Sequence, residues 1–162
     1  MKTWKLLLLA LVPGLWGWLC NWLVSMSLTG GNGFLFMVVY YLLQAPAAIV
    51  FCLWLGRRCG RSERGYPACL LLTQWPSLVS FALYVWQFWF VTDEARSSLL
   101  ALLGQAPSIP LTHFAACLVL PFSGDSWLQA DSTAATAISL VLLAVLFSLG
   151  FWWGRRSRSS AS

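Results

Sequence analysis

Four long runs without any Asp, Glu, Lys, Arg or His constrain this chain more than any other feature of its sequence. They cover residues 6–28, 34–55, 69–91 and 134–153. About 20 apolar residues in an α-helix cross the hydrocarbon core of a bilayer, which is about 30 Å thick. The strands of a membrane barrel alternate apolar and polar side chains, whereas these runs are apolar on nearly every side. The sequence therefore predicts an all-α integral membrane protein with four transmembrane helices in an antiparallel bundle.

The composition supports a single membrane domain over residues 1–162. Hydrophobic residues make up 59% of the chain and charged residues 9%, with a mean hydropathy of +0.74. A soluble domain carries about a quarter charged residues, and a disordered chain is polar and highly charged. Both classes are excluded by this composition.

The first run resembles the start of a signal peptide, because Lys2 and Lys5 precede a stretch of leucines. It is longer than a usual signal-peptide core, and no A-x-A cleavage site follows it. We therefore expect residues 6–28 to be an uncleaved first transmembrane helix.

The distribution of Lys and Arg predicts the orientation of the four helices. Cytoplasmic loops of membrane proteins carry an excess of these residues. With four spans, one side holds the basic residues of the amino-terminal end, of loop 56–68 and of tail 154–162, and the other side, loop 92–133, holds only Arg96. We expect both termini to be cytoplasmic, in a plasma or inner cell membrane. This asymmetry accounts for the net charge of +5, and no nucleic-acid partner is predicted.

Loop 56–68 is short and basic. An arginine near a membrane surface gains about 1 kcal/mol from anionic lipid. The candidate contacts with anionic headgroups are Arg57, Arg58, Arg61 and Arg64.

Small and polar residues recur at steps of three and four along the first and third helices, which places each set on one helix face. Gly14 and Gly17 are candidates for close helix packing, since small residues let backbones approach. Alternatively, the faces form a polar seam between the first three helices, to which two glutamines beside prolines contribute amides. The candidate seam residues are Asn21, Gln44, Gln74, Ser77, Ser80, Tyr84 and Gln87.

The four runs contain no ionisable acid, base or histidine, which disfavours proton coupling and intramembrane proteolysis. The five cysteines form no C-x-x-C pair, so no metal site and no cofactor are predicted. In the outer loop, a base, a nucleophile and two carboxylates offer the minimum for acid-base chemistry: His113, Ser123, Asp125 and Asp131. The surrounding residues are more typical of a turn, so we expect no enzyme.

Loop 92–133 is long for a compact protein and only partly polar. Asp93 is placed to cap a short helix that ends at Gly104, and a second apolar piece covers residues 114–120. Pro107 and Pro110 separate the two pieces. We expect them to lie flat as a cap on the outer face; a re-entrant hairpin and a fifth span are the alternatives.

The function expected from these features is that of an accessory or scaffold subunit, which assists a larger membrane complex. Its partners would be the lipid bilayer and another membrane protein or a second copy of itself. The alternative is a small transporter or channel component that uses the polar seam. The sequence specifies neither a substrate nor an oligomeric state.

Overall fold

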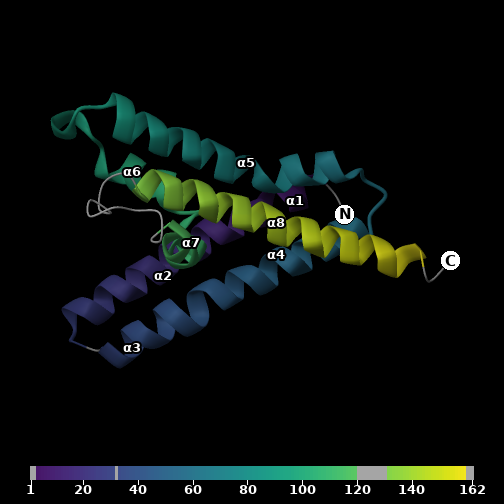
Figure 1. Ribbon diagram of the computed structural model, residues 1–162, viewed down its shortest axis with the longest axis horizontal. Coiled ribbons are helices and arrows are strands. Elements are labelled where there is room, and N and C mark those ends of the chain that lie inside the picture. The colour runs from purple at the N-terminus through teal and green to yellow at the C-terminus, as the bar shows by residue number, and fades with distance from the viewer. Residues whose placement is uncertain (1–2, 32, 120–130, 160–162) are drawn as a thin grey trace.

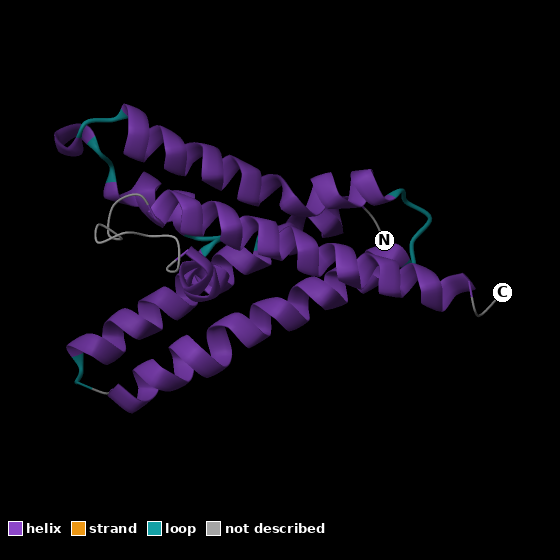
Figure 2. Ribbon diagram, viewed as in Figure 1, coloured by secondary structure: helices purple, strands orange, loops and turns teal. Residues whose placement is uncertain are grey.

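The computed structural model describes residues 3–31, 33–119 and 131–159, and within these ranges it contains helices and no strand (Figures 1 and 2). The elements in chain order are α1 (Thr3–Ala10), α2 (Val12–Thr29), α3 (Gly33–Met37), the π-helix η1 (Val38–Gln44), α4 (Ala45–Gly60), α5 (Tyr66–Val85), the π-helix η2 (Trp86–Phe90), the 3-10 helix η3 (Asp93–Ala95), α6 (Ser98–Gln105), α7 (Ile109–Val119) and α8 (Asp131–Ser159).

Four continuous helical segments are long and apolar enough to cross a membrane. They are Thr3–Thr29, Gly33–Gly60, Tyr66–Phe90 and Ser132–Arg158. The predicted all-α class and the four long apolar helices are thus confirmed. The second and fourth segments extend through arginines beyond their charge-free runs, because arginine is a good helix former and its charge ends the apolar surface without ending the helix. The basic loop predicted at 56–68 is accordingly much shorter, since α4 ends at Gly60 and α5 begins at Tyr66.

Prolines explain the local irregularities of the first two segments. Pro13 has no N–H to donate to the preceding turn, and the helix is interrupted at Leu11 between α1 and α2. Pro46 stands in the first turn of α4, directly after the π-helix η1. π-helical turns are rare and often accompany functional sites.

The two ends of the molecule differ in shape (Figure 1). At the narrow end, the start of α1, the turn between α4 and α5 and the end of α8 lie on the same side of the molecule. At the wide end, the hairpin of α2 and α3 diverges from the end of α5. There, α6 packs along α5, and α7 contacts α2, α4 and α8. The axes of α6 and α7 differ by 76°.

A glycine seam joins α4 to α8 near the narrow end, formed by Gly56, Gly60, Gly150 and Gly154. A Cβ atom at each of these glycines would overlap a backbone carbonyl oxygen of the other helix. Gly56 lies against Phe147 and Gly60 against Phe151, so the two helices run parallel. Both carry the G-x-x-x-G spacing that allows membrane helices to approach closely and to exchange Cα–H···O contacts.

An apolar narrow-end cluster fills the space beside the glycine seam. Its buried members are Leu6, Leu55, Cys59, Cys69, Phe147 and Phe151. Each is at most 3% exposed, and they come from α1, α4, α5 and α8. The helices therefore pack tightly against one another at the narrow end.

Candidate functional site

A polar cavity of about 210 Å³ lies among the helices in the half of the molecule toward the wide end. It is lined mainly by amide and hydroxyl side chains from the four long segments and from α6 and α7. They include Asn21, Tyr40, Gln44, Tyr84, Thr112 and Thr136. The lining residues that the structure describes include no Asp, Glu, Lys, Arg or His.

The turn between α6 and α7 forms the floor of this cavity, halfway along the bundle. A Cβ atom at Gly17 would overlap the Ala106 carbonyl oxygen and lie 3.0 Å from Pro110 Cδ. Gly17 is near the middle of the segment Thr3–Thr29. The chain enters this hairpin from the wide end, after η2, and returns to the wide end at α8. The hairpin turn therefore contacts the middle of the first long segment, and the bent pair of α6 and α7 has the form of a broken span or of a re-entrant loop.

Gln44 attaches the turn to the second long segment. This side chain is 4% exposed, and its Nε2 donates a hydrogen bond of 2.8 Å to the Ile109 carbonyl oxygen. The Gln44 carbonyl oxygen in turn accepts a 3.0 Å hydrogen bond from Trp16 Nε1. The two bonds tie α2, η1 and the start of α7 together at the base of the cavity.

Tyr84 forms the opposite wall. Its side chain is 1% exposed, and its hydroxyl donates to Ser132 Oγ at 2.8 Å. A Cβ atom at Gly104 would lie 2.9 Å from the Tyr84 backbone nitrogen, so only a glycine lets α6 pack this closely on α5. The cavity wall is thus held by one side-chain bond and one backbone contact.

The threonine hydroxyls act as hydrogen-bond acceptors toward the cavity. Thr112 Oγ1 donates to the Ser108 carbonyl oxygen at 2.9 Å, and Thr136 Oγ1 donates to the Ser132 carbonyl oxygen at 2.7 Å. With the proton used within the helix, the lone pairs of each oxygen remain available to a bound molecule. The site thereby presents acceptors as well as amide donors.

The predicted polar seam divides into three groups. Asn21, Gln44 and Tyr84 line the cavity together. Ser77 and Gln74 lie on α5 closer to the narrow end than Tyr84, and Ser77 is buried while Gln74 is partly exposed.

The remaining two seam candidates lie elsewhere. Gln87 is 2% exposed and fixes the loop after η2, because its Oε1 accepts a 3.1 Å bond from the Ser97 N–H. Ser80 lines an apolar groove of about 430 Å³ on the other side of the hairpin turn, together with Gly14, Trp18 and Leu103.

The predicted packing glycines contact the hairpin turn, and neither meets another long helix. Gly17 touches Ala106 and Pro110, while a Cβ atom at Gly14 would lie 3.7 Å from Pro107 Cγ. The two positions therefore allow the turn to reach the middle of the bundle.

Sequence reasoning missed the contribution of α6 and α7 to the cavity, which comprises Gln105, Ser108 and Thr112. The signal available was a polar, proline-flanked stretch between two apolar pieces too short to span. His113, on α7, packs edge-on against Tyr40 with ring centroids 5.5 Å apart. An ionisable side chain thus lies among the helices, beside a residue of the cavity wall, although the four runs contain none.

The residues proposed for acid-base chemistry are not assembled by the described part of the structure. Ser123 and Asp125 lie outside the described residues. Within 3–31, 33–119 and 131–159, no group of three His, Cys, Asp or Glu side chains is arranged to hold a metal ion.

The four predicted lipid-contact arginines occupy different environments. The Arg57 guanidinium lies 4.5 Å from the ring centroid of Trp153, and that of Arg58 lies 5.3 Å from that of Trp54. Arg61 is exposed, and Arg64 Nη2 donates to Thr3 Oγ1 at 2.8 Å. They form no single cluster.

Comparisons with known proteins add no assignment to this geometry. No protein-family model, curated protein or solved structure matches the chain. The polar cavity and its hairpin are therefore the features from which a function must be argued.

Proposed function

We propose that the chain spans a plasma or inner cell membrane four times, with the narrow end and both termini in the cytoplasm. The four long apolar segments support membrane insertion. Basic residues support the orientation, since Arg57, Arg64 and Arg155 belong to the narrow end and Arg96 to the wide end. In this orientation the hairpin of α6 and α7 enters the membrane from outside.

We propose further that the protein is a small transporter or channel component that admits an uncharged polar solute into the polar cavity. The observation that carries this proposal is a cavity lined mainly by residues with amide and hydroxyl groups, assembled from all four long segments and the hairpin. Polar groups facing hydrocarbon are costly, and a bundle selected for packing alone would fill such a space with apolar side chains.

The cavity chemistry limits the solute class. No charged residue lines its described part, so neither a cation nor an anion would find a counter-charge. A volume of about 210 Å³ equals that of roughly seven water molecules. Water itself, or a polyol or amide of a few non-hydrogen atoms, fits this size and its mixture of donors and acceptors.

The proposed orientation, together with this arrangement, supports an outward-open form. The cavity extends from Ser132 near the wide end to Ile109 at the turn, and the narrow-end cluster seals the other half. Broken helices at the membrane midplane are the sites where transporters rearrange. Passage would require the hairpin turn to move away from Gln44.

The accessory-subunit hypothesis remains a second proposal, because a bundle with large lipid-facing surfaces is compatible with a partner. It does not account for a polar cavity, however. Reproducible purification with a second membrane chain in fixed stoichiometry, together with no solute flux, would favour it.

Flux through purified protein in liposomes tests the transport proposal. Water, glycerol and urea permeation would be followed by light scattering for wild type, for Asn21→Leu and for Gln74→Leu. Both variants exchange an amide for leucine at a position that is not fully buried, but only Asn21 lines the cavity. We expect flux of at least one solute to fall about tenfold in Asn21→Leu and to be unchanged in Gln74→Leu. Wild-type flux equal to that of protein-free liposomes would contradict the proposal.

A further inference from the structure

The narrow end carries a second cavity, of about 460 Å³, between the turn after α4 and the last turns of α8. Its charged lining residues are Glu63, Arg64, Arg155 and Arg158, which gives three positive charges and one negative charge. Arg158 and Glu63 form a loose pair with an N–O distance of 3.9 Å, and both side chains are largely exposed. Such surface pairs contribute little, so the cavity keeps a positive surplus.

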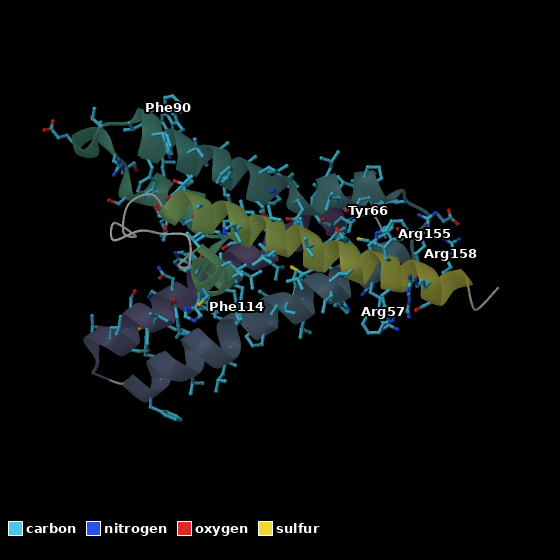
Figure 3. The ribbon with its side chains drawn as sticks, viewed as in Figure 1. Arg57, Tyr66, Phe90, Phe114, Arg155 and Arg158 are labelled. Atoms are coloured by element: carbon cyan, nitrogen blue, oxygen red, sulfur yellow. The ribbon has the colours of Figure 1, made fainter. Side chains whose placement is uncertain are left out.

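Arg64 and Arg155 line this cavity from two separate elements. Arg64 donates from Nη2 to Thr3 Oγ1 at 2.8 Å, which holds its guanidinium beside the start of α1. Arg155 projects from α8 at the same end (Figure 3). Guanidinium groups bind phosphate oxygens through paired N–H donors, and the two positive charges exceed the single negative charge of a phosphodiester.

An apolar strip leads from Arg155 along one face of α8 toward the middle of the bundle. Trp152, Ser148, Val145 and Val141 follow Arg155 at steps of three and four, which keeps them on that face. Trp152 is 53% exposed, Val145 46% and Val141 60%.

Tyr66 connects the strip to the start of α5. Its ring stacks on that of Trp152 with centroids 5.9 Å apart, and its hydroxyl lies 2.8 Å from Ser148 Oγ. Aromatic side chains with a polar group are typical of the membrane interface. The basic cavity is thus bordered by an interfacial pair and continues into an exposed apolar surface.

We propose that this cavity binds the phosphate of an anionic phospholipid, with an acyl chain lying along Trp152, Val145 and Val141. The apolar strip favours a lipid over a soluble phosphate compound, because only a lipid would use both parts of the surface. The site rests on the membrane placement of the chain and is independent of solute transport through the polar cavity.

Native mass spectrometry of the full chain in detergent tests this site. The protein would be mixed with equal amounts of phosphatidylglycerol and phosphatidylcholine that carry the same acyl chains. We expect wild type to retain phosphatidylglycerol preferentially and Arg155→Gln to lower that preference about fivefold. Arg61→Gln is the matched control, because it removes the same charge at the same end and Arg61 does not line the cavity.

Two results would overturn the proposal. An equal loss of preference in Arg61→Gln and Arg155→Gln would show that lipid selection depends on the overall charge of the narrow end and not on this cavity. Displacement of the lipid by millimolar inorganic phosphate would assign the cavity to a soluble phosphate compound. Arg155→Lys serves as a second variant and is expected to keep part of the preference, because it retains the charge without the paired donors.

Discussion

The narrow and wide ends of the molecule use glycine in different ways. At the narrow end, four glycines bring the backbones of two long helices into direct contact over two turns of each helix. Toward the wide end, Gly17 of α2 contacts the turn of a short hairpin, and Gly104 within that hairpin lets α6 pack closely on Tyr84 of α5. The turn region carries amides and hydroxyls. The glycine seam leaves little space between the backbones of α4 and α8, whereas the packing of the hairpin leaves the polar cavity between the helices. The comparison teaches that the same residue type closes one half of the bundle and opens the other to a polar cavity.

The difference extends to the side chains around each glycine set. The narrow-end cluster is apolar and nearly inaccessible, whereas the cavity wall depends on a few hydrogen bonds, such as that from Gln44 to Ile109. A bond between a side chain and a turn is more easily broken than a backbone-to-backbone seam. We therefore expect conformational change at the wide end, while the packing of the narrow end stays unchanged.

The largest expected effect comes from adding one methyl group to the glycine seam. Gly56→Ala or Gly150→Ala should each destabilise the fold by about 1–3 kcal/mol, because the new Cβ atom meets backbone atoms that cannot rotate away. Unfolding of the purified protein by urea, followed by tryptophan fluorescence, measures the change in free energy.

Gly14→Ala is the matched control for the seam variants. Its added Cβ atom meets only Pro107 Cγ at 3.7 Å, an ordinary contact, and alanine favours the helix by up to about 1 kcal/mol. We expect this variant to be neutral or slightly stabilising. A loss of stability as large as that of the seam variants would contradict the account, because it would show that an added methyl group is equally costly at the hairpin turn and at the glycine seam.

A smaller effect separates the roles of two tyrosines. Tyr84→Phe at the cavity and Tyr66→Phe at the narrow end each remove a 2.8 Å bond to a serine hydroxyl. Each should cost about 1 kcal/mol of stability. Only Tyr84→Phe should change solute flux in liposomes, since Tyr66 lies away from the cavity. A change of similar size in both variants would indicate that flux follows stability alone.

The positions of the long helices could be predicted from the sequence because a single physical requirement, an uncharged surface of sufficient length, fixes them. The glycine seam was also present in the sequence as two G-x-x-x-G pairs. Arg57 and Arg58 conceal the first pair, because two charges after an apolar run predict the end of a membrane helix and a loop that begins at Gly56. The helix continues through them to Gly60.

The composition of the cavity could be predicted only in part. Steps of three and four put Asn21 on one face of the first helix and Tyr84 on one face of the third, and both reach the cavity. Gln87 does not, because it lies within the π-helix η2, where the helical register changes. The depth of the hairpin turn depends on contacts with Gly17 and Gln44 that lie far apart in sequence, and no local pattern specifies such contacts.

The most direct test of the account is the accessibility of the cavity from each side of the membrane. Thr112→Cys, at a partly exposed position that lines the cavity, would be placed in a Cys117→Ser background, in which the four remaining native cysteines are buried. Sealed vesicles would be treated on either side with a membrane-impermeant thiol reagent, with Thr92→Cys and Arg61→Cys as exposed markers of the wide and narrow ends. The account predicts that Thr112→Cys reacts from the side that labels Thr92→Cys and from no other. Labelling from the side of Arg61→Cys, or none from either side in folded protein, would contradict it.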